Sequence, residues 1–243
     1  MKLFQRIFFA AVLAGLLAGV LMSAVQQWRV APLILEAEVY EDAAPADHSH
    51  GQAAEAVAPH DHDAGEWAPA DGAERIGFTL AANLLVAMGF GLLLAAVSVL
   101  TGLPVTPANG VLWGLGGFLA LQLAPSLGLP PELPGMPAAE IGAGQLWWWA
   151  TALSTGAGLL AIARFRNWQA IAVAAVLIVA PHVSGAPAAP DEPSAVPAHL
   201  ATSFAASALA VAGVFWLLLG PLYGYLLQRF SAERLPAARK ATA

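Results

Sequence analysis

Four of the six histidines lie within fifteen positions of the chain. They form two His-x-His pairs beside Asp residues, namely His48 with His50 and His60 with His62. In an extended segment residues two apart point the same way, so each pair can present two imidazoles to one ion. Imidazole with carboxylate suits Co, Ni, Zn or Cu better than Ca or Mg. The pattern indicates capture of a transition-metal ion, although a hydrophilic spacer with incidental histidines is the alternative, because no structural zinc spacing is present.

The other two histidines flank a single connection between apolar runs. His182 ends the fifth run directly after Pro181, and His199 opens the sixth. An ionisable group at membrane depth is costly and therefore marks a candidate functional site. A histidine at the interface can equally bond a backbone carbonyl or water, so both interpretations stay open.

Three carboxylates follow the first apolar run, and they could complete a mixed nitrogen and oxygen site with His182 and His199. Glu38 and Glu41 share a face if their segment is helical, whereas Glu36 and Glu38 share a side if it is extended. The alternative is an ordinary solvated acidic flank.

The elements that position these residues are apolar. Hydrophobic residues make up 58% of the chain and charged residues 11%, against about 25% charged in an average soluble domain. Most of the apolar runs reach the roughly 20 residues that cross a bilayer core. We predict one all-α integral membrane domain over 1–243, a polytopic bundle of six transmembrane helices, with five possible because Pro181 shortens the fifth. The runs are Phe4–Val25, Ile76–Leu100, Asn109–Leu127, Gly142–Ala163, Trp168–Ala186 and Thr202–Leu227.

Charge sorts by sign along the chain. Fifteen of the sixteen Asp and Glu fall in three gaps, about 26–75, 128–141 and 183–201, and eight of the ten Lys and Arg fall elsewhere. The positive-inside rule then places both termini in the cytoplasm and the acidic gaps outside. We expect a mobile outer loop over 37–75 and a basic cytoplasmic tail over 228–243. A cleaved signal peptide is the alternative for the first run, which is longer than a usual signal h-region.

Within the runs the sequence predicts packing rather than catalysis. Pairs of glycines four apart, such as Gly15 with Gly19 and Gly110 with Gly114, predict close helix contacts. Three tryptophans at 147–149 predict an aromatic belt at the outer interface. Apart from Arg6, the runs contain no Lys, Arg, Asp or Glu. The chain has no cysteine, phosphate loop, Ser-His-Asp set or His-Glu-x-x-His motif, so we expect no enzyme and no permanently bound cofactor.

Three strings give the chain a family resemblance. They are the segment from Gln27 to Glu41 with its Pro-Leu-Ile-Leu-Glu-Ala-Glu core, Arg164 to Trp168, and Pro181 to Pro187. The order of these strings, together with the His-rich first outer loop, resembles the CbtA family of probable cobalt transporter subunits. The resemblance implies a bacterial inner-membrane protein in cobalt uptake linked to cobalamin synthesis, with a small single-helix, His-bearing partner subunit, CbtB.

These observations leave three functional hypotheses. In the first, outer His and carboxylate groups collect Co²⁺, or Ni²⁺ or Zn²⁺, and the bundle passes the ion inward. In the second, the chain is a non-transporting, membrane-anchored metal receptor or an assembly scaffold for a partner transporter. A third is a pH-responsive membrane protein, because histidine pairs titrate near pH 6.5.

Overall fold

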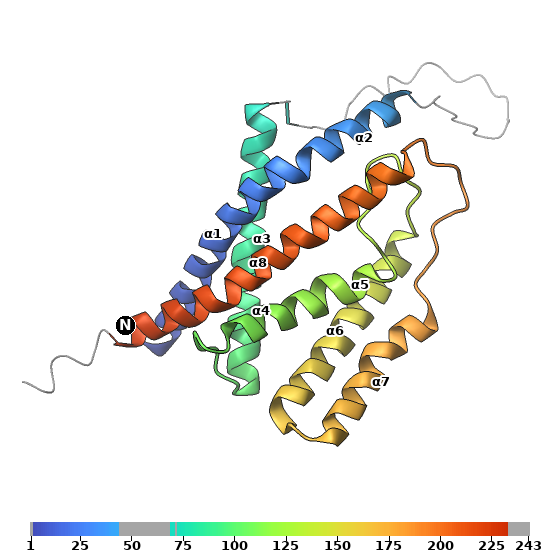
Figure 1. Cartoon of the computed structure of the whole chain (residues 1–243). Coiled ribbons are helices and arrows are strands. Elements are labelled where there is room, and N and C mark those ends of the chain that lie inside the picture. The colour runs from blue at the N-terminus through green and yellow to red at the C-terminus, as the bar shows by residue number, and fades with distance from the viewer. Residues whose placement is uncertain (1, 44–68, 71, 233–243) are drawn as a thin grey trace, which may run out of the picture.

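The structure, a computed structural model, describes residues 2–43, 69–70 and 72–232, without the side chains of 41–43. Every regular element in these ranges is helical (Figure 1). Within them, four helices are long and apolar enough to cross a membrane: α1 (Leu3–Arg29), α3 (Ala73–Thr101), α6 (Ile141–Phe165) and α8 (Ala198–Ala232). The shorter elements are α2 (Ala31–Ala43), α4 (Gly110–Phe118), the π-helix η1 (Leu119–Leu123), α5 (Ala124–Ser126) and α7 (Trp168–Ser184).

The predicted all-α, polytopic membrane bundle is confirmed for the described residues. Four of the six apolar runs correspond to the long helices, and the other two correspond to shorter apolar helices over Gly110–Ser126 and Trp168–Ser184. The 17 residues of α7 rise about 26 Å, slightly less than the bilayer core. That all six cross the membrane therefore remains a prediction.

Pro32 and Pro181 lie inside helical segments without ending them. Pro32 falls in the first turn of α2, where a missing N–H matters little, so the chain continues from α1 through Val30 into a second helix. The sequence also suggested that Pro181 interrupts the fifth run, and this was wrong. Helix α7 passes through Pro181 to Ser184, because the proline lies in its last turn.

The predicted outer loop of 37–75 has helix at both of its ends. Helix α2 extends to Ala43 and α3 begins at Ala73, so only the stretch between them could be a loop. His48, His50, His60 and His62 lie outside the described residues. Similarly, α8 reaches Ala232, and most of the predicted tail of 228–243 is outside the described part.

Small residues set the helix contacts, as the sequence predicted. Gly15 lies against the backbone of α3, where an added Cβ would stand 2.5 Å from the Ala87 carbonyl oxygen. Where α4 meets α8, a Cβ on Gly114 would stand 2.1 Å from the Trp216 carbonyl oxygen. Such approaches exclude any side chain, so these backbones pack directly. The resulting core joins α1, α3, α4 and α8.

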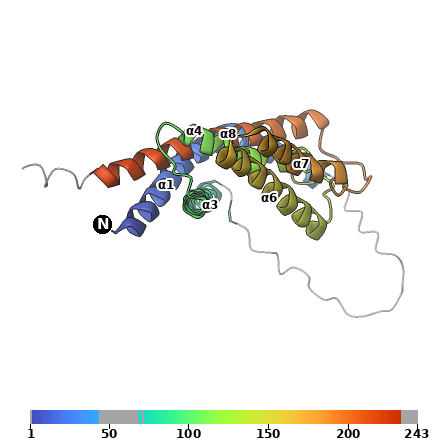
Figure 2. The ribbon, with the colours of Figure 1, turned by 90° about the horizontal axis from the view of Figure 1, so that it is seen from below.

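Helices α6 and α7 form a second group with η1 and α5. They lie side by side at one flank of the molecule, and α1 and α3 lie at the other (Figure 2). Helix α8 extends along the first group and touches η1. Each hydrogen bond of the π-helix spans one residue more than in an α-helix, a geometry that occurs frequently at functional sites.

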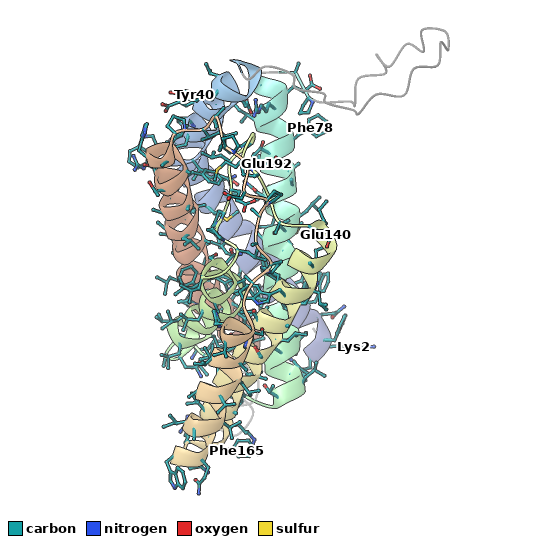
Figure 3. The ribbon with its side chains drawn as sticks, turned by 90° about the vertical axis from the view of Figure 1, so that its right-hand side faces the viewer. Lys2, Tyr40, Phe78, Glu140, Phe165 and Glu192 are labelled. Carbon is teal, nitrogen blue, oxygen red and sulfur yellow. The ribbon has the colours of Figure 1, made fainter. Side chains whose placement is uncertain are left out.

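The acidic and basic segments gather at opposite ends of the bundle. Figure 3 shows Tyr40 and Glu192 toward one end and Phe165 at the other, with Glu140 nearer the first end and Lys2 nearer the second. Phe165 stands between Arg164 and Arg166, so it marks the basic turn between α6 and α7. At the acidic end, a small core of Ala37, Leu133, Val196 and Leu200 holds α2, two connections and the start of α8 together.

Candidate functional site

His182, near the end of α7, has contacts at both ring nitrogens. Nδ1 lies 2.8 Å from the Ile178 carbonyl oxygen on the same helix, and Nε2 lies 3.0 Å from the Ala124 carbonyl oxygen of α5. Carbonyl oxygens only accept hydrogen bonds, so both contacts are hydrogen bonds only when both ring nitrogens carry protons. A neutral ring bonds one of the two carbonyls. In this arrangement a metal ion gains a His182 ligand only after one contact opens.

Trp147 packs on this histidine, which corrects the aromatic-belt interpretation for this residue. The two rings meet edge to face, with centroids 5.7 Å apart, and Trp147 is only 8% exposed. Its indole Nε1 donates a hydrogen bond to the Pro181 carbonyl oxygen at 3.1 Å. Trp149, by contrast, is 56% exposed, as a belt residue would be. Trp147 thus joins α6 to the end of α7. The three consecutive tryptophans in the sequence do not indicate this role.

His199 lies in a different environment, in the first turn of α8. Its side chain is exposed, and the described residues offer its ring no hydrogen-bond partner. The next residue, Leu200, is buried with Ala37 of α2. His199 therefore belongs to the acidic end formed by α2 and α8, whereas His182 belongs to the group of α5, α6 and α7.

The three glutamates of the segment after α1 lie on α2, and they are not equivalent. Glu38 forms a two-pronged ion pair with Arg75 of α3, in which Nη1 donates to Oε2 at 3.1 Å and Nη2 donates to Oε1. Arg75 thus engages both oxygens that a metal ion would use. Glu36 is exposed, and the side chain of Glu41 is outside the described part.

A pair of carboxylates that the sequence did not single out lines a surface pocket of about 280 Å³. Glu140 caps α6, accepting hydrogen bonds from the Gly142 and Ala143 N–H groups at 2.8 and 2.6 Å, and these bonds lower the pKa of its carboxyl group. Partial burial raises the pKa of Glu132. The signal for Glu140 was present in the sequence, as an acid directly before an apolar run.

The described residues contain no group of three or more His, Asp or Glu side chains placed to hold a metal ion. His182 and His199 flank the 185–197 connection, but His182 contacts α5 and α6, whereas His199 lies exposed in the first turn of α8. The predicted ligand set of His48, His50, His60, His62, His182, His199, Glu36, Glu38 and Glu41 therefore stays a prediction.

A family model described as "Probable cobalt transporter subunit (CbtA)" matches residues 4–228. Comparison with curated proteins and with solved structures gives no match. The matched range covers all four long helices apart from Leu3 and the last four residues of α8, together with both shorter apolar helices and the connections between them. The resemblance carried by the three sequence strings is thereby confirmed. The chain belongs to the CbtA family of probable cobalt transporter subunits.

Proposed function

We propose that this chain is the membrane subunit of a divalent-metal uptake system whose cargo is cobalt. The observation that carries the proposal is the family match over residues 4–228, on a bundle with four long and two shorter apolar helices. The proposal adds three details to the family description: the orientation of the bundle, the residues that collect the ion and the need for a partner.

The separation of charge between the two ends supports the orientation. Lys2 and the arginines around Phe165 lie at the end opposite Glu140 and Glu192. Basic residues stay preferentially on the cytoplasmic side of a membrane. Six spans with both termini in the cytoplasm fit this arrangement, with the acidic end facing outward.

The outer end would collect the ion in two steps. His48, His50, His60 and His62 would capture it with neighbouring Asp residues, and His199 with Glu36 and Glu41 would receive it. Glu38 would contribute when its pair with Arg75 opens, and His182 when it releases a carbonyl. A single-helix, His-bearing subunit of the CbtB type would supply further imidazole ligands.

Metal uptake tests this proposal directly. Cells that express the chain with its partner should accumulate Co²⁺, measured by mass spectrometry, and a parallel Ni²⁺ experiment would give the selectivity. We expect His182→Ala with His199→Ala to lower Co²⁺ uptake strongly. Gln169→Ala, at the opposite end of α7 and exposed, is the control and should leave it unchanged. Full uptake by the double histidine variant would refute the proposed His182 and His199 step.

Deleting residues 43–73 tests the role of the His-rich segment separately. If the segment only concentrates the ion, uptake should weaken at scarce Co²⁺ and recover at excess. Loss of uptake at every concentration would instead make the segment part of the transport path. If the deletion variant accumulated as much Co²⁺ as the intact chain at scarce Co²⁺, both roles would be contradicted.

A non-transporting metal receptor or assembly scaffold is the second candidate. It is favoured by one observation, that the described residues hold no cluster of three metal-binding side chains. A scaffold would bind Co²⁺ at its outer end yet give vesicles no Co²⁺ accumulation, even with the partner present. The two candidates are distinguished by reconstituting the purified chain and its partner in sealed vesicles, applying a Co²⁺ gradient and measuring Co²⁺ accumulation inside.

A further inference from the structure

Two threonines of α6 are buried with unbonded hydroxyl groups. Thr151 is 0% and Thr155 2% exposed, and no described atom is a hydrogen-bond partner of either hydroxyl. Hydroxyls on helices usually bond a carbonyl of the preceding turn. Several in this protein do so: Ser23, Thr101, Ser126, Ser154, Ser184, Thr202 and Ser231. An unbonded buried hydroxyl costs about 1–3 kcal/mol, so the pair calls for an occupant.

The contacts of α6 with α7 show what faces these threonines. Trp147 bonds the Pro181 carbonyl, and Gly158 lies against Ala174, where an added Cβ would be 3.2 Å from the Ala174 Cα. The two helices are therefore antiparallel in this interface. Thr151 and Thr155 occupy the same face of α6 between the two contacts, one and two turns beyond Trp147. They consequently stand opposite the stretch 175–178 of α7.

That stretch contains a carbonyl without its normal helical donor. Proline has no N–H, so Pro181 leaves the carbonyl of Leu177, four residues earlier, without its backbone partner. In a helix this carbonyl points toward the position of Pro181, whose own carbonyl oxygen accepts the bond from Trp147 of α6. The Leu177 carbonyl, which has no proline N–H to bond, thus belongs to the stretch of α7 opposite Thr151 and Thr155.

The π-helix η1 bounds the same region from the third side. A Cβ added to Gly156, the residue after Thr155, would lie 3.9 Å from the Ala120 Cβ. Pro125 lies just after η1 and, like Pro181, has no N–H, so a carbonyl of the preceding turn loses its helical donor. The two threonine hydroxyls and the Leu177 carbonyl therefore belong to the region where α6, α7 and η1 meet.

The chemistry of these oxygens selects the ligand class. All are neutral, and the apolar runs of α6, α7 and η1 contain no Asp or Glu. A divalent transition metal prefers imidazole and carboxylate. Membrane transporters bind sodium with main-chain carbonyls at interrupted helices. We propose that the Thr151 and Thr155 hydroxyls, with the Leu177 carbonyl, bind a monovalent alkali cation between α6, α7 and η1. A role for this cation in driving cobalt uptake rests on the proposed function, but its binding does not.

Thermal unfolding of the purified full-length chain tests the binding. NaCl and KCl would each be titrated against choline chloride at constant ionic strength. We expect one alkali ion to raise the melting temperature of the unaltered chain. Thr151→Val and Thr155→Val keep the side-chain shape and remove one oxygen. Each should raise the concentration for half-maximal stabilisation about tenfold, and the double variant should abolish the response.

Ser154→Ala is the matched control, because Ser154 lies between the two threonines but bonds the Thr151 carbonyl of its own helix. It should keep the full response to the alkali ion. Equal responses in the control and both valine variants, or no response in the unaltered chain, would overturn the proposal. If only a water molecule bridges the oxygens, each valine variant would change the melting temperature by the same amount at every salt composition, and no ion would matter; this result would also overturn the proposal.

The measurement separates this proposal from the proposed function, since it contains no cobalt. Failure of Co²⁺ accumulation would refute cobalt uptake and leave alkali binding intact. Absence of alkali stabilisation would refute the cation site and leave cobalt uptake intact.

Discussion

Gly114 offers the sharpest test of the helix packing. It lies where α4 meets α8, and an added Cβ would stand 2.1 Å from the carbonyl oxygen and 2.9 Å from the carbonyl carbon of Trp216. Both are main-chain atoms, so no rotamer change relieves the clash. The helices would have to separate by roughly 1 Å, which opens the close-packed core around Trp216. We expect Gly114→Ala to destabilise the protein by about 1–3 kcal/mol through overpacking.

Gly116→Ala is the matched control on the same helix. No atom lies within 4 Å of a Cβ added there, so this change should be neutral, or stabilising by up to about 1 kcal/mol from helix propensity. Thermal unfolding in detergent, followed by loss of the monodisperse species, measures the difference. For a chain of this size, each kcal/mol shifts the melting temperature by roughly 2–4 °C. Equal melting temperatures for the two alanine variants would refute the direct backbone contact between α4 and α8.

Three further predictions concern polar contacts. Asn83 of α3 donates to Ser23 Oγ at 3.1 Å and Gln26 Oε1 at 2.7 Å of α1, so Asn83→Leu should destabilise the bundle by about 0.6–1.7 kcal/mol in the same melting assay. A double-mutant cycle of Glu38→Gln and Arg75→Gln should give a coupling of no more than about 1 kcal/mol that shrinks in high salt, because about a third of each side chain is exposed. Backbone N–H bonds lower the pKa of Glu140 in the folded protein, so its contribution to stability is complete above the unfolded pKa and is lost as pH falls through the folded pKa. Glu140→Gln should thus have a lower melting temperature than the unaltered chain at pH 7, and this difference should close as the pH falls below about 4. A difference in melting temperature that does not depend on pH would refute this account.

The sequence predicted the helical bundle well because its signals are local. Apolar runs, uncharged apart from Arg6 and most of them of membrane length, marked six helical stretches. Glycine pairs four residues apart, beginning at Gly15 and at Gly110, marked faces of close contact. Backbone hydrogen bonds must be satisfied within a segment that lies in lipid, so composition alone largely determines the element type there. The end of α7 was less predictable, because the effect of Pro181 depends on whether it lies in an interior turn or in the last one.

The candidate site was less predictable, since it depends on partners far apart in the sequence. Nothing in the string of three tryptophans indicates that Trp147 turns inward to Pro181, 34 residues later, while Trp149 faces outward. Likewise, nothing in the sequence indicates that Glu38 forms an ion pair with Arg75. The contact of His182 with Ala124 crosses 58 residues and uses a main-chain oxygen, which no residue type reveals.

The distribution of ligand types within the bundle has an energetic consequence for a divalent cargo. In the sequence, the imidazoles and all but one of the carboxylates lie in or beside three connections between apolar runs, whereas the runs themselves offer mostly neutral oxygens, with Arg6 as their one Lys, Arg, Asp or Glu. A membrane potential of about 100 mV favours entry of a divalent ion by roughly 4.6 kcal/mol. Stripping a small ion of water costs far more than this, unless other ligands replace the lost water. The ion must therefore cross with much of its hydration shell or with ligands from a second subunit. Reconstitution with the proposed single-helix partner is therefore decisive, because imidazoles on such a helix would supply interior ligands that the described residues do not bring together.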